Sequence, residues 1–310
     1  MPATTLPGGA VVTTFPALPP AFDLSKASDS DRAKFGIPRF APGSDADKQW
    51  SEMTKRLRFI EPTFKPRTRQ RKELPHFKPD HGPETTTIWS GGITFPAAGD
   101  KIWDVNGTWN IPKATPPSGA KNGITYTAST WIGIDGDDGS GDVLQAGCDA
   151  DVTPSGSGAD YQFNPWWEWY PAGSYWITNL PAASAGDQFM CWIQCLPLLG
   201  GAAKANSALL FLANLTGGFG LFFVATAPNH VTLQGNCAEW IVEALETGPN
   251  NAPELAKYTP VTFTNCKTVT VKDKLVESGS GNTINMVDSG NHVISKGKLV
   301  GSDEVQVSYV

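Results

Sequence analysis

Four short segments of this chain place carboxylates or a carboxamide among tryptophans and glycines. Within each segment the residues two positions apart share one face if the segment is an extended strand. The four groups are Trp131, Gly133 and Asp135; Gln145, Gly147 and Asp149; Trp166, Glu168 and Tyr170; and Glu239, Ile241 and Glu243. A carboxylate can move a proton and a carboxamide can donate a hydrogen bond, so such a face could hydrolyse a bound substrate. A solvent-exposed sheet face would also be polar, and the pattern alone leaves both interpretations open.

Other common catalytic groups are poorly placed. Cys191 and Cys195 have a spacing found in metal sites, but no second Cys/His pair accompanies them, so we expect no metal and no cofactor. A catalytic cysteine needs a histidine base, and neither His230 nor His292 lies in a recognisable motif. We expect buried thiols, or one disulfide, among the five cysteines: Cys148, Cys191, Cys195, Cys237 and Cys266.

The charge of the chain changes sign near Trp89. Residues 1–88 carry 14 Lys/Arg and 10 Asp/Glu, a net of +4, whereas residues 89–310 carry 10 and 20, a net of −10, which together give −6. Ten of the 11 tryptophans follow the same boundary. We therefore predict a basic, proline-rich segment over 1–88 and one domain over 89–310. The acidic domain makes nucleic acid an improbable partner, because its surface would repel phosphates.

The N-terminal segment is expected to be largely irregular over residues 1–43, where proline and small residues dominate. Ser44 or Asp45 could begin a short helix in which Trp50, Met53 and Leu57 share a face. The stretch 55–78 then carries nine basic and two acidic residues. It is either a solvated linker or a segment that lies on the acidic domain and blocks it until it is removed.

The N-terminus does not resemble a secretory signal, and the apolar stretch 209–225 does not resemble a membrane helix. The N-terminus lacks the basic start and unbroken apolar run of a secretory signal. The segment Leu209–Ala225 is strongly apolar, but Asn214, Thr216 and Gly217 interrupt it. This interruption predicts two strands joined by a hairpin turn rather than a membrane helix.

The elements that must hold the polar face are predicted to be strands. After Trp89, short runs of β-branched and aromatic residues alternate with Gly, Pro, Asn and Asp, which favours an all-β, antiparallel β-sandwich. One stretch stays ambiguous. In Ala238–Glu246, the residues Glu239 and Glu243 could share a helix face as well as a strand face.

Four sequence blocks, taken in order, resemble the glutamic peptidases, the eqolisin or G1 family. The blocks are Trp-Ile-Gly-Ile-Asp-Gly at 131–136, Leu-Gln-Ala-Gly at 144–147 followed by Asp149, Trp-Glu-Trp-Tyr-Pro at 167–171 and Ala-Glu-Trp-Ile-Val-Glu at 238–243. Each block is short, but the ordered combination is specific, and the similarity runs from about Trp89 to the C-terminus.

The resemblance implies a function and a site. It implies an acid-active endopeptidase whose substrate is a polypeptide, with Glu239 as the catalytic glutamate and Gln145 as its partner. Other positions that would line or support the site are Trp131, Asp135, Asp149, Glu168 and Tyr170. It further implies a sandwich of two curved, lectin-like sheets in which Ala238–Glu243 is a strand, a removable basic propeptide matching residues 1–88, and an extracellular location.

General chemistry also supports a carboxylate and a carboxamide as a catalytic pair, independently of the resemblance. Amide hydrolysis needs a base for water, a donor for the tetrahedral oxyanion and an acid for the leaving nitrogen. A carboxylate at Glu239 could serve as base and then acid, while the Gln145 carboxamide could hold the oxyanion. Two alternatives remain open: a glycoside hydrolase that uses Glu168 and Glu239, and a non-catalytic carbohydrate-binding sandwich.

Overall fold

The computed structural model describes residues 2–20, 22–38, 43–67, 83–136, 141–245 and 254–310. Within these ranges, 20 strands join one hydrogen-bonded sheet, while β8 (Ala114–Thr115) and β17 (Lys257–Tyr258) form a separate pair. Two of the described pairings, β15 with β3 and β20 with β5, are parallel. The other described pairings in the large sheet are antiparallel, which confirms the prediction of an antiparallel β domain.

The strands follow one continuous order that divides into two runs. The β9 run contains β4 (Thr63–Pro66), β12 (Gly173–Thr178), β11 (Gly158–Tyr170), β10 (Val143–Ser155), β9 (Tyr126–Ile134), β16 (Ala238–Glu243), β6 (Trp89–Thr94), β20 (Asn282–Val287), β21 (Val293–Val300) and β22 (Glu304–Tyr309). The β7 run contains β18 (Val261–Thr270), β7 (Ile102–Asn110), β13 (Gln188–Gln194), β14 (Ser207–Asn214), β15 (Phe219–Thr226), β2 (Val11–Thr14) and β1 (Ala3–Thr5). Short elements complete the fold: β3 (Arg58–Phe59), β5 (Glu84–Thr86), β19 (Leu275–Glu277), α3 (Leu196–Leu199), η1 (Leu24–Lys26) and η3 (Ser278–Ser280).

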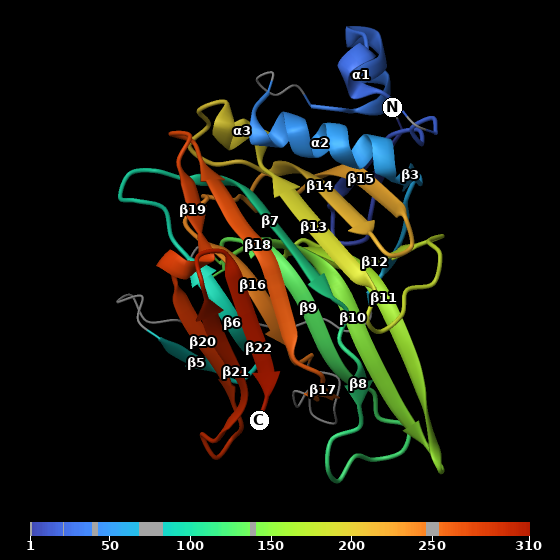
Figure 1. Cartoon of the computed structure of the whole chain (residues 1–310), viewed down its shortest axis with the longest axis vertical. Coiled ribbons are helices and arrows are strands. Elements are labelled where there is room, and N and C mark those ends of the chain that lie inside the picture. Colours follow the sequence, from blue (N-terminus) through green and yellow to red (C-terminus); the bar gives the residue numbers. More distant parts are fainter. Residues whose placement is uncertain (1, 21, 39–42, 68–82, 137–140, 246–253) are drawn as a thin grey trace.

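The strand β18 joins the two runs, because Val261–Phe263 pairs with β22 and the residues from Thr264 onward pair with β7. Away from this junction, β7 contacts β9, and β10 contacts β13 and β14, without hydrogen-bonded pairing. Figure 1 shows the two groups of strands lying one behind the other. The largest apolar cluster lies between them.

Alternation along the strands assigns each side chain to one of two faces. Ile132, Leu144, Trp167 and Trp240 point into the main core between the runs. Trp131, Trp166 and Ile241 instead form a second apolar cluster on the opposite face of the β9 run, together with Trp89. Apart from Asp135, the polar residues singled out from the sequence share this second face, as the period-two pattern predicts.

The N-terminal segment is structured, so the expectation that residues 1–43 are largely irregular is wrong. β2 pairs with β15, and the helix α1 (Asp29–Phe35) begins at a Ser28 capping box. Phe15, Leu24 and Phe35 are buried in a cluster with residues of β13, β14 and β15. The spacing of these three residues in the sequence matches neither the helical nor the strand period. The sequence pattern therefore could not predict that tertiary packing would bury them.

The predicted short helix is confirmed as α2 (Asp45–Arg56), with the Ser44 hydroxyl accepting the backbone N–H of Asp47 at 3.2 Å. Figure 1 shows α2 lying across β14 and β15. Trp50 is fully buried there and packs against the rings of Trp192, Phe211 and Phe222.

The apolar stretch 209–225 folds as the hairpin of β14 and β15, as predicted. The turn between the two strands contains the polar residues that interrupted the apolar pattern, and the Asn214 carboxamide accepts the N–H of Gly217 at 2.7 Å. In the part of the chain that the structure describes, no helix has both the length and the apolar character needed to cross a membrane.

A buried polar relay links α2 to the β7 run. The indole N–H of Trp50 donates to Gln194 Oε1 at 3.3 Å, and Gln194 Nε2 donates to Asp104 Oδ2 at 2.9 Å. The indole N–H of Trp192 donates to the same Asp104 oxygen at 2.7 Å. Burial nevertheless raises the pKa of Asp104 to about 7, because desolvation of the charged form outweighs these two hydrogen bonds.

Asp104 should therefore make the fold more stable in acid. The folded pKa lies above the unfolded value of 3.8, so the folded state binds more protons between these two values and the free energy of unfolding falls as pH rises through the window. The total loss in the free energy of unfolding is on the order of 4 kcal/mol, because each pKa unit between the unfolded and folded values corresponds to about 1.36 kcal/mol. Urea unfolding between about pH 4 and 8 should show a flatter pH dependence in Asp104→Asn, whereas exposed Asp160→Asn should follow the wild type. Parallel curves for Asp104→Asn and wild type would contradict this role.

Candidate active site

A row of four residues crosses the β9 run on the face opposite the main core. Backbone pairing sets Glu168 beside Gln145, Gln145 beside Gly133 and Gly133 beside Glu239. The row therefore spans β11, β10, β9 and β16 in that order. Strand register thus places residues some 100 positions apart in sequence side by side. The row contains a carboxamide between two carboxylates.

Gly133 lies between Gln145 and Glu239 in the row and contributes no side chain. Two strand spacings separate the Cα atoms of Gln145 and Glu239 by about 10 Å. A Cβ on Gly133 would lie 3.0 Å from the Trp131 ring and 3.4 Å from the Gln145 Cβ, so glycine keeps this part of the row clear. No side chain therefore stands between the carboxylate of Glu239 and the carboxamide of Gln145 along the row.

Glu168 orients the Gln145 carboxamide. Gln145 Nε2 donates to Glu168 Oε2 at 2.7 Å, and both side chains are buried. This hydrogen bond fixes which end of the carboxamide faces β11. Tyr170, two residues beyond Glu168, is half-buried at the end of β11 and lies at the rim of the site.

Glu239 is fully buried on the strand β16, which pairs with β6 on one side and β9 on the other. The helix–strand ambiguity of this stretch is thus resolved in favour of a strand. The thiol of Cys237 donates to Glu239 Oε1 at 3.5 Å, a sulfur hydrogen bond from two residues earlier on the same face. The carboxylate is held within the sheet rather than on a mobile loop.

Asp135 supports the site through backbone contacts instead of facing it with Trp131 and Gly133. It follows the end of β9 with a φ of 64°, which ends the strand alternation at this residue. Its carboxylate accepts the N–H groups of three consecutive residues, 234–236, at 2.5–3.0 Å. Its own N–H donates to the Cys237 carbonyl at 3.1 Å. Asp135 therefore fixes the loop that leads into β16.

A second polar row lies about four residues farther along the same strands. Pairing places Asp149 beside Ser129 and Ser129 beside Glu243. Glu243 Oε2 accepts the indole N–H of Trp131 at 2.9 Å, and Ser129 Oγ donates to Asp149 Oδ1 at 2.7 Å. Strand alternation with Glu239 would have indicated Glu243 as a site residue, whereas Ser129 carries no comparable signal in its sequence.

Arg67, from the N-terminal segment, reaches into this second row. Its guanidinium binds Asp149 through Nε at 3.0 Å and through Nη2 at 2.5 Å, and it stacks 4.0 Å from the Trp166 ring centroid. Arg67 and Asp149 have exposed side-chain fractions of 1% and 0%. The basic stretch suggested contact with the acidic domain, but nothing in its composition distinguished Arg67 from its neighbours.

Four of the thiol groups are poorly suited to nucleophilic chemistry. All five cysteines are buried, and burial raises the pKa of Cys148, Cys191, Cys195 and Cys266, that of Cys195 to about 12. Within the described ranges, no cluster of three or more His, Cys, Asp or Glu residues is arranged to bind a metal ion.

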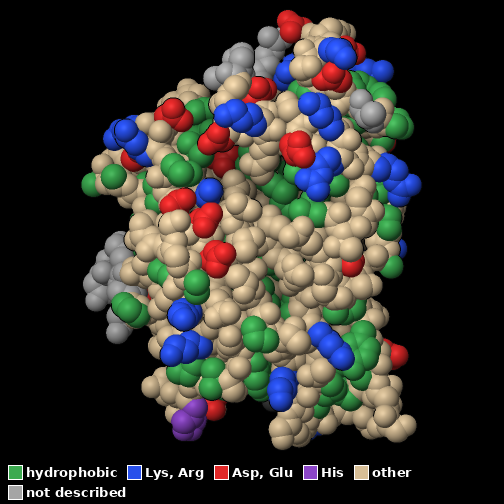
Figure 2. All heavy atoms as spheres, in the orientation of Figure 1, with side chains coloured by type: hydrophobic (Ala, Val, Ile, Leu, Met, Phe, Trp, Pro, Cys, Tyr) green, Lys and Arg blue, Asp and Glu red, His purple; other side chains and the backbone are tan. Residues whose placement is uncertain are grey.

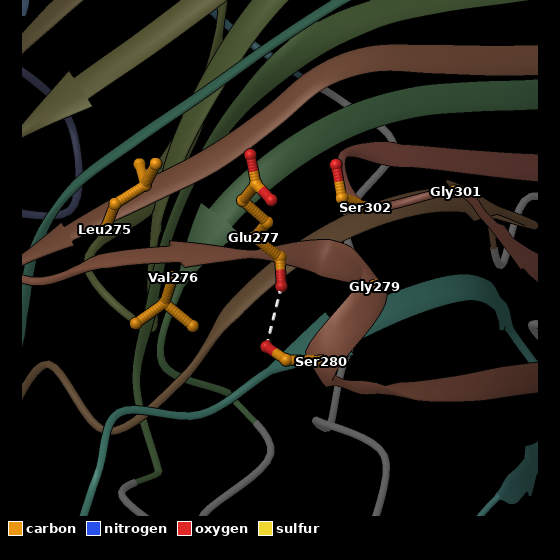
Figure 3. A pocket seen from close by; sticks show the side chains of 7 residues that line it. All are labelled: Leu275, Val276, Glu277, Gly279, Ser280, Gly301 and Ser302. Carbon is orange, nitrogen blue, oxygen red and sulfur yellow. Dashed lines mark hydrogen bonds between the residues drawn. The ribbon is translucent and has the colours of Figure 1, made fainter.

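A surface pocket of about 590 Å³ lies elsewhere, between β19, η3 and the turn after β21. Figure 3 shows Glu277, Ser280 and Ser302 at its wall, with the Ser280 hydroxyl donating to the Glu277 carbonyl. Figure 2 shows acidic and basic side chains interspersed on the viewed face of the molecule. None of the residues predicted from the sequence lines this pocket, so the two buried rows remain the candidate site.

The chain is similar to known proteins in sequence and in fold. The model of the Peptidase A4 family matches residues 87–309. Aspergillopepsin-2 of Aspergillus niger is 26% identical over 241 residues, which cover 73% of this chain and 79% of that protein. The crystal structure of scytalido-glutamic peptidase with a transition state analog inhibitor is similar over 72% of this chain and 98% of that chain, with a TM-score of 0.57 and 25% identity. The aspergilloglutamic peptidase from Aspergillus niger is similar over 60% and 99%, with a TM-score of 0.50 and 28% identity. The chain therefore belongs to the peptidase A4 family, the glutamic peptidases or eqolisins.

Proposed function

We propose that this glutamic peptidase cleaves polypeptides in acid with Glu239 and Gln145 as its catalytic pair. The observation that carries the proposal is the row in which Gly133 on β9 separates Gln145 on β10 from Glu239 on β16. A scissile amide above Gly133 would lie between a proton acceptor on β16 and a hydrogen-bond donor on β10. Glu168 supports this assignment because it holds the Gln145 carboxamide in place.

Glu239 transfers one proton twice in this mechanism. Its carboxylate removes a proton from water as the hydroxide oxygen bonds to the amide carbon. The Gln145 N–H stabilises the oxyanion of the tetrahedral intermediate. The protonated Glu239 then gives its proton to the nitrogen as the C–N bond breaks, which yields a carboxylic acid and an amine. A model glutamate has a pKa of about 4.3, so a group that alternates between both forms suits an acidic medium.

The arrangement of the β7 and β9 runs relative to one another is also part of the proposal. We infer that the β7 and β9 runs are the two curved layers of a lectin-like sandwich, and the non-paired contacts of β10 with β13 and β14 support this interpretation. The scytalido-glutamic peptidase structure contains a transition state analog inhibitor, and another relative is bound to a tripeptide. A polypeptide substrate is proposed for this chain on these grounds, and an extracellular place of action on its similarity to aspergillopepsin-2 and scytalidopepsin B.

The glycoside hydrolase alternative fits the geometry less well. Glu168 and Glu239 are separated by three strand spacings, so their Cα atoms lie about 14 Å apart. Paired catalytic carboxyls of glycosidases lie about 5–9.5 Å apart, so these two side chains would have to lean toward each other across Gln145 and Gly133. Glu168 is also engaged by Gln145, a residue that has no role in that mechanism.

Purified protein should release peptides from denatured casein at about pH 3–5 and should release no sugar from soluble glucans. The reason is that the row presents one proton-transferring carboxylate and an oxyanion donor rather than two facing carboxyls. Chelators and thiol alkylation are expected to leave cleavage intact. Sugar release without casein cleavage would contradict the proposed function.

We further propose that residues 1–88 are an inhibitory propeptide of the domain formed by residues 89–310. The pairing of β4 with β12 and the burial of Arg67 beside Asp149 support this division, because the first adds the segment to the edge of the β9 run and the second brings a guanidinium onto the face that holds Gln145. The expected cleavage region, from Lys72 to Trp89, falls largely outside the described residues.

Incubation at acidic pH should shorten the chain from its N-terminus and raise its activity. A synthetic peptide covering residues 55–78 should inhibit the shortened enzyme, and added salt should weaken this inhibition by screening the attraction between opposite charges. Mass spectrometry together with a peptide assay at several ionic strengths would follow both effects. A full-length chain that is fully active and never shortened would be incompatible with the propeptide assignment.

A further inference from the structure

The thiol of Cys237 lies against the carboxylate that the proposed mechanism uses. Cys237 Sγ is 3.5 Å from Glu239 Oε1, and both side chains are fully buried. Cys237 belongs to the apolar cluster of Trp89 and Trp131, on the face of the β9 run that is opposite the main core. A thiol is a weak hydrogen-bond donor, and an ionised carboxylate is an acceptor. One oxygen of Glu239 therefore faces a donor that can hold it in place.

The backbone around Cys237 is fixed on both sides. Before it, the Asp135 carboxylate accepts the N–H groups of residues 234–236, and the Asp135 N–H donates to the Cys237 carbonyl at 3.1 Å. After it, Ala238 pairs with β9 on one side and with β6 on the other. The main chain at Cys237 therefore has little freedom, and the thiol can move mainly by rotation about the Cα–Cβ bond.

The oxygen that contacts the thiol also lies close to Gly136. A Cβ on Gly136 would be 3.4 Å from Glu239 Oε1 and 3.3 Å from the Trp89 ring. Gly136 has a φ of 117°, a conformation that favours glycine, so the chain carries no side chain at this point. Packing near Gly136 thus restricts the movement of Oε1, and Cys237 supplies this oxygen with a donor.

A weak donor suits a carboxyl group that must gain and lose a proton. Burial disfavours the ionised form of a carboxyl group, and a donor to that form offsets the effect. Alanine in place of Cys237 would remove the offset. A serine hydroxyl is a better donor, but its shorter bond to Cβ would place it farther from Oε1. The thiol can therefore stabilise the carboxylate without preventing it from accepting a proton.

We propose that Cys237 is a positioning residue for Glu239, whose thiol holds Oε1 and stabilises the ionised carboxylate that removes the proton from water. The inference rests on the proposed roles of Glu239 and Gln145. The thiol keeps its own proton throughout the reaction and contacts neither the water nor the substrate. Because Cys237 acts only through the orientation and ionisation of Glu239, its removal should change kcat rather than KM.

The first arm of the test measures kcat against pH on one chromogenic peptide, between about pH 2 and 7. Cys237→Ala should lower the maximal kcat by about 5–10-fold and move the midpoint of the acid limb upward by roughly 0.5–1 unit, with KM nearly unchanged. Cys237→Ser keeps a donor and should recover at least half of this shift. Cys191→Ala is the matched control, because it removes a buried thiol from β13 in the main core. Its midpoint should equal that of the wild type.

The charged groups around Glu239 are the same in all of these variants. They are Asp135 at the end of β9, Glu243 on β16, Asp149 on β10, Glu168 on β11 and Arg67, while β6 carries no titratable side chain. A shift in Cys237→Ala that is absent from Cys191→Ala would therefore be due to the missing thiol. Wild-type kcat and midpoint in Cys237→Ala would overturn the inference, and so would equal shifts in the alanine and serine variants.

The second arm observes the hydrogen bond without catalysis. The infrared difference spectrum of wild type minus Cys237→Ala contains the S–H stretching band of Cys237. A hydrogen bond to an ionised acceptor is stronger than one to a neutral acceptor, so the band should move to higher frequency when acid protonates Glu239. In the Glu239→Gln background the band should stay constant over the same pH range. If Cys237→Ala does not fold, Cys237→Ser supplies the difference spectrum, since it also lacks this thiol.

The two arms separate failure of this inference from failure of the proposed function. A band that responds to pH, without cleavage of any peptide, would overturn the proposed mechanism while supporting the contact between thiol and carboxylate. Cleavage that requires Glu239, together with a band that does not respond to pH, would overturn the role of Cys237 and leave the proposed function in place.

Discussion

Glu239→Gln is expected to reduce peptide cleavage by several orders of magnitude, on the order of 10⁴-fold, because the same group must accept and return a proton. The substitution keeps the shape of the side chain and its capacity to accept the Cys237 hydrogen bond. Glutamine cannot be a general base, so the loss should appear in kcat. Steady-state kinetics on one chromogenic peptide at about pH 4 would measure it.

The control for this variant is Glu277→Gln, which changes a carboxylate at the separate surface pocket. It should retain wild-type kinetics, and both variants should unfold at temperatures close to that of the wild type. Near-normal cleavage by a folded Glu239→Gln would remove Glu239 from the mechanism.

Gln145→Ala is expected to lower kcat by about 10²–10³-fold, the usual cost of removing one oxyanion donor. KM should change less, since the hydrogen bond strengthens mainly in the transition state. Removing the carboxamide also leaves Glu168 without its 2.7 Å contact, so part of the loss reflects a buried acceptor that loses its donor.

Glu168→Gln distinguishes the two hydrolytic mechanisms. A glutamine at this position can still accept from Gln145 Nε2, so a peptidase should keep measurable cleavage. A two-carboxylate glycosidase would instead lose as much activity as in Glu239→Gln. Kinetics of all three folded variants on the same peptide would decide the matter, and equal, near-complete losses in Glu168→Gln and Glu239→Gln would contradict the role given to Gln145.

The sequence predicted the β class and the polar face, because period-two alternation survives in each strand separately. It did not predict which residues lie level with one another. Register between β9 and β16 depends on pairing between residues about 100 positions apart, and no local pattern encodes that pairing. The resemblance to a family, rather than the pattern, singled out Gln145 and Glu239.

Asp135 and Arg67 illustrate two further limits. Alternation placed Asp135 with Trp131, but a positive φ redirects its carboxylate to the backbone of residues 234–236. Arg67 belongs to a stretch of nine basic residues, and only tertiary packing selects it for the buried pair with Asp149. Backbone conformation at strand ends and contacts between distant segments are the parts that the sequence left undetermined.

The pairing of β4 with β12 has a consequence for the behaviour of the protein in solution. While β4 is in place, it covers the backbone hydrogen-bonding edge of Gly173–Thr178. Removal of the N-terminal segment would expose that row of N–H and C=O groups, and an uncovered edge strand invites pairing with other chains. The uncovered edge would favour self-association, so the shortened enzyme should be more prone to aggregate than the full-length chain.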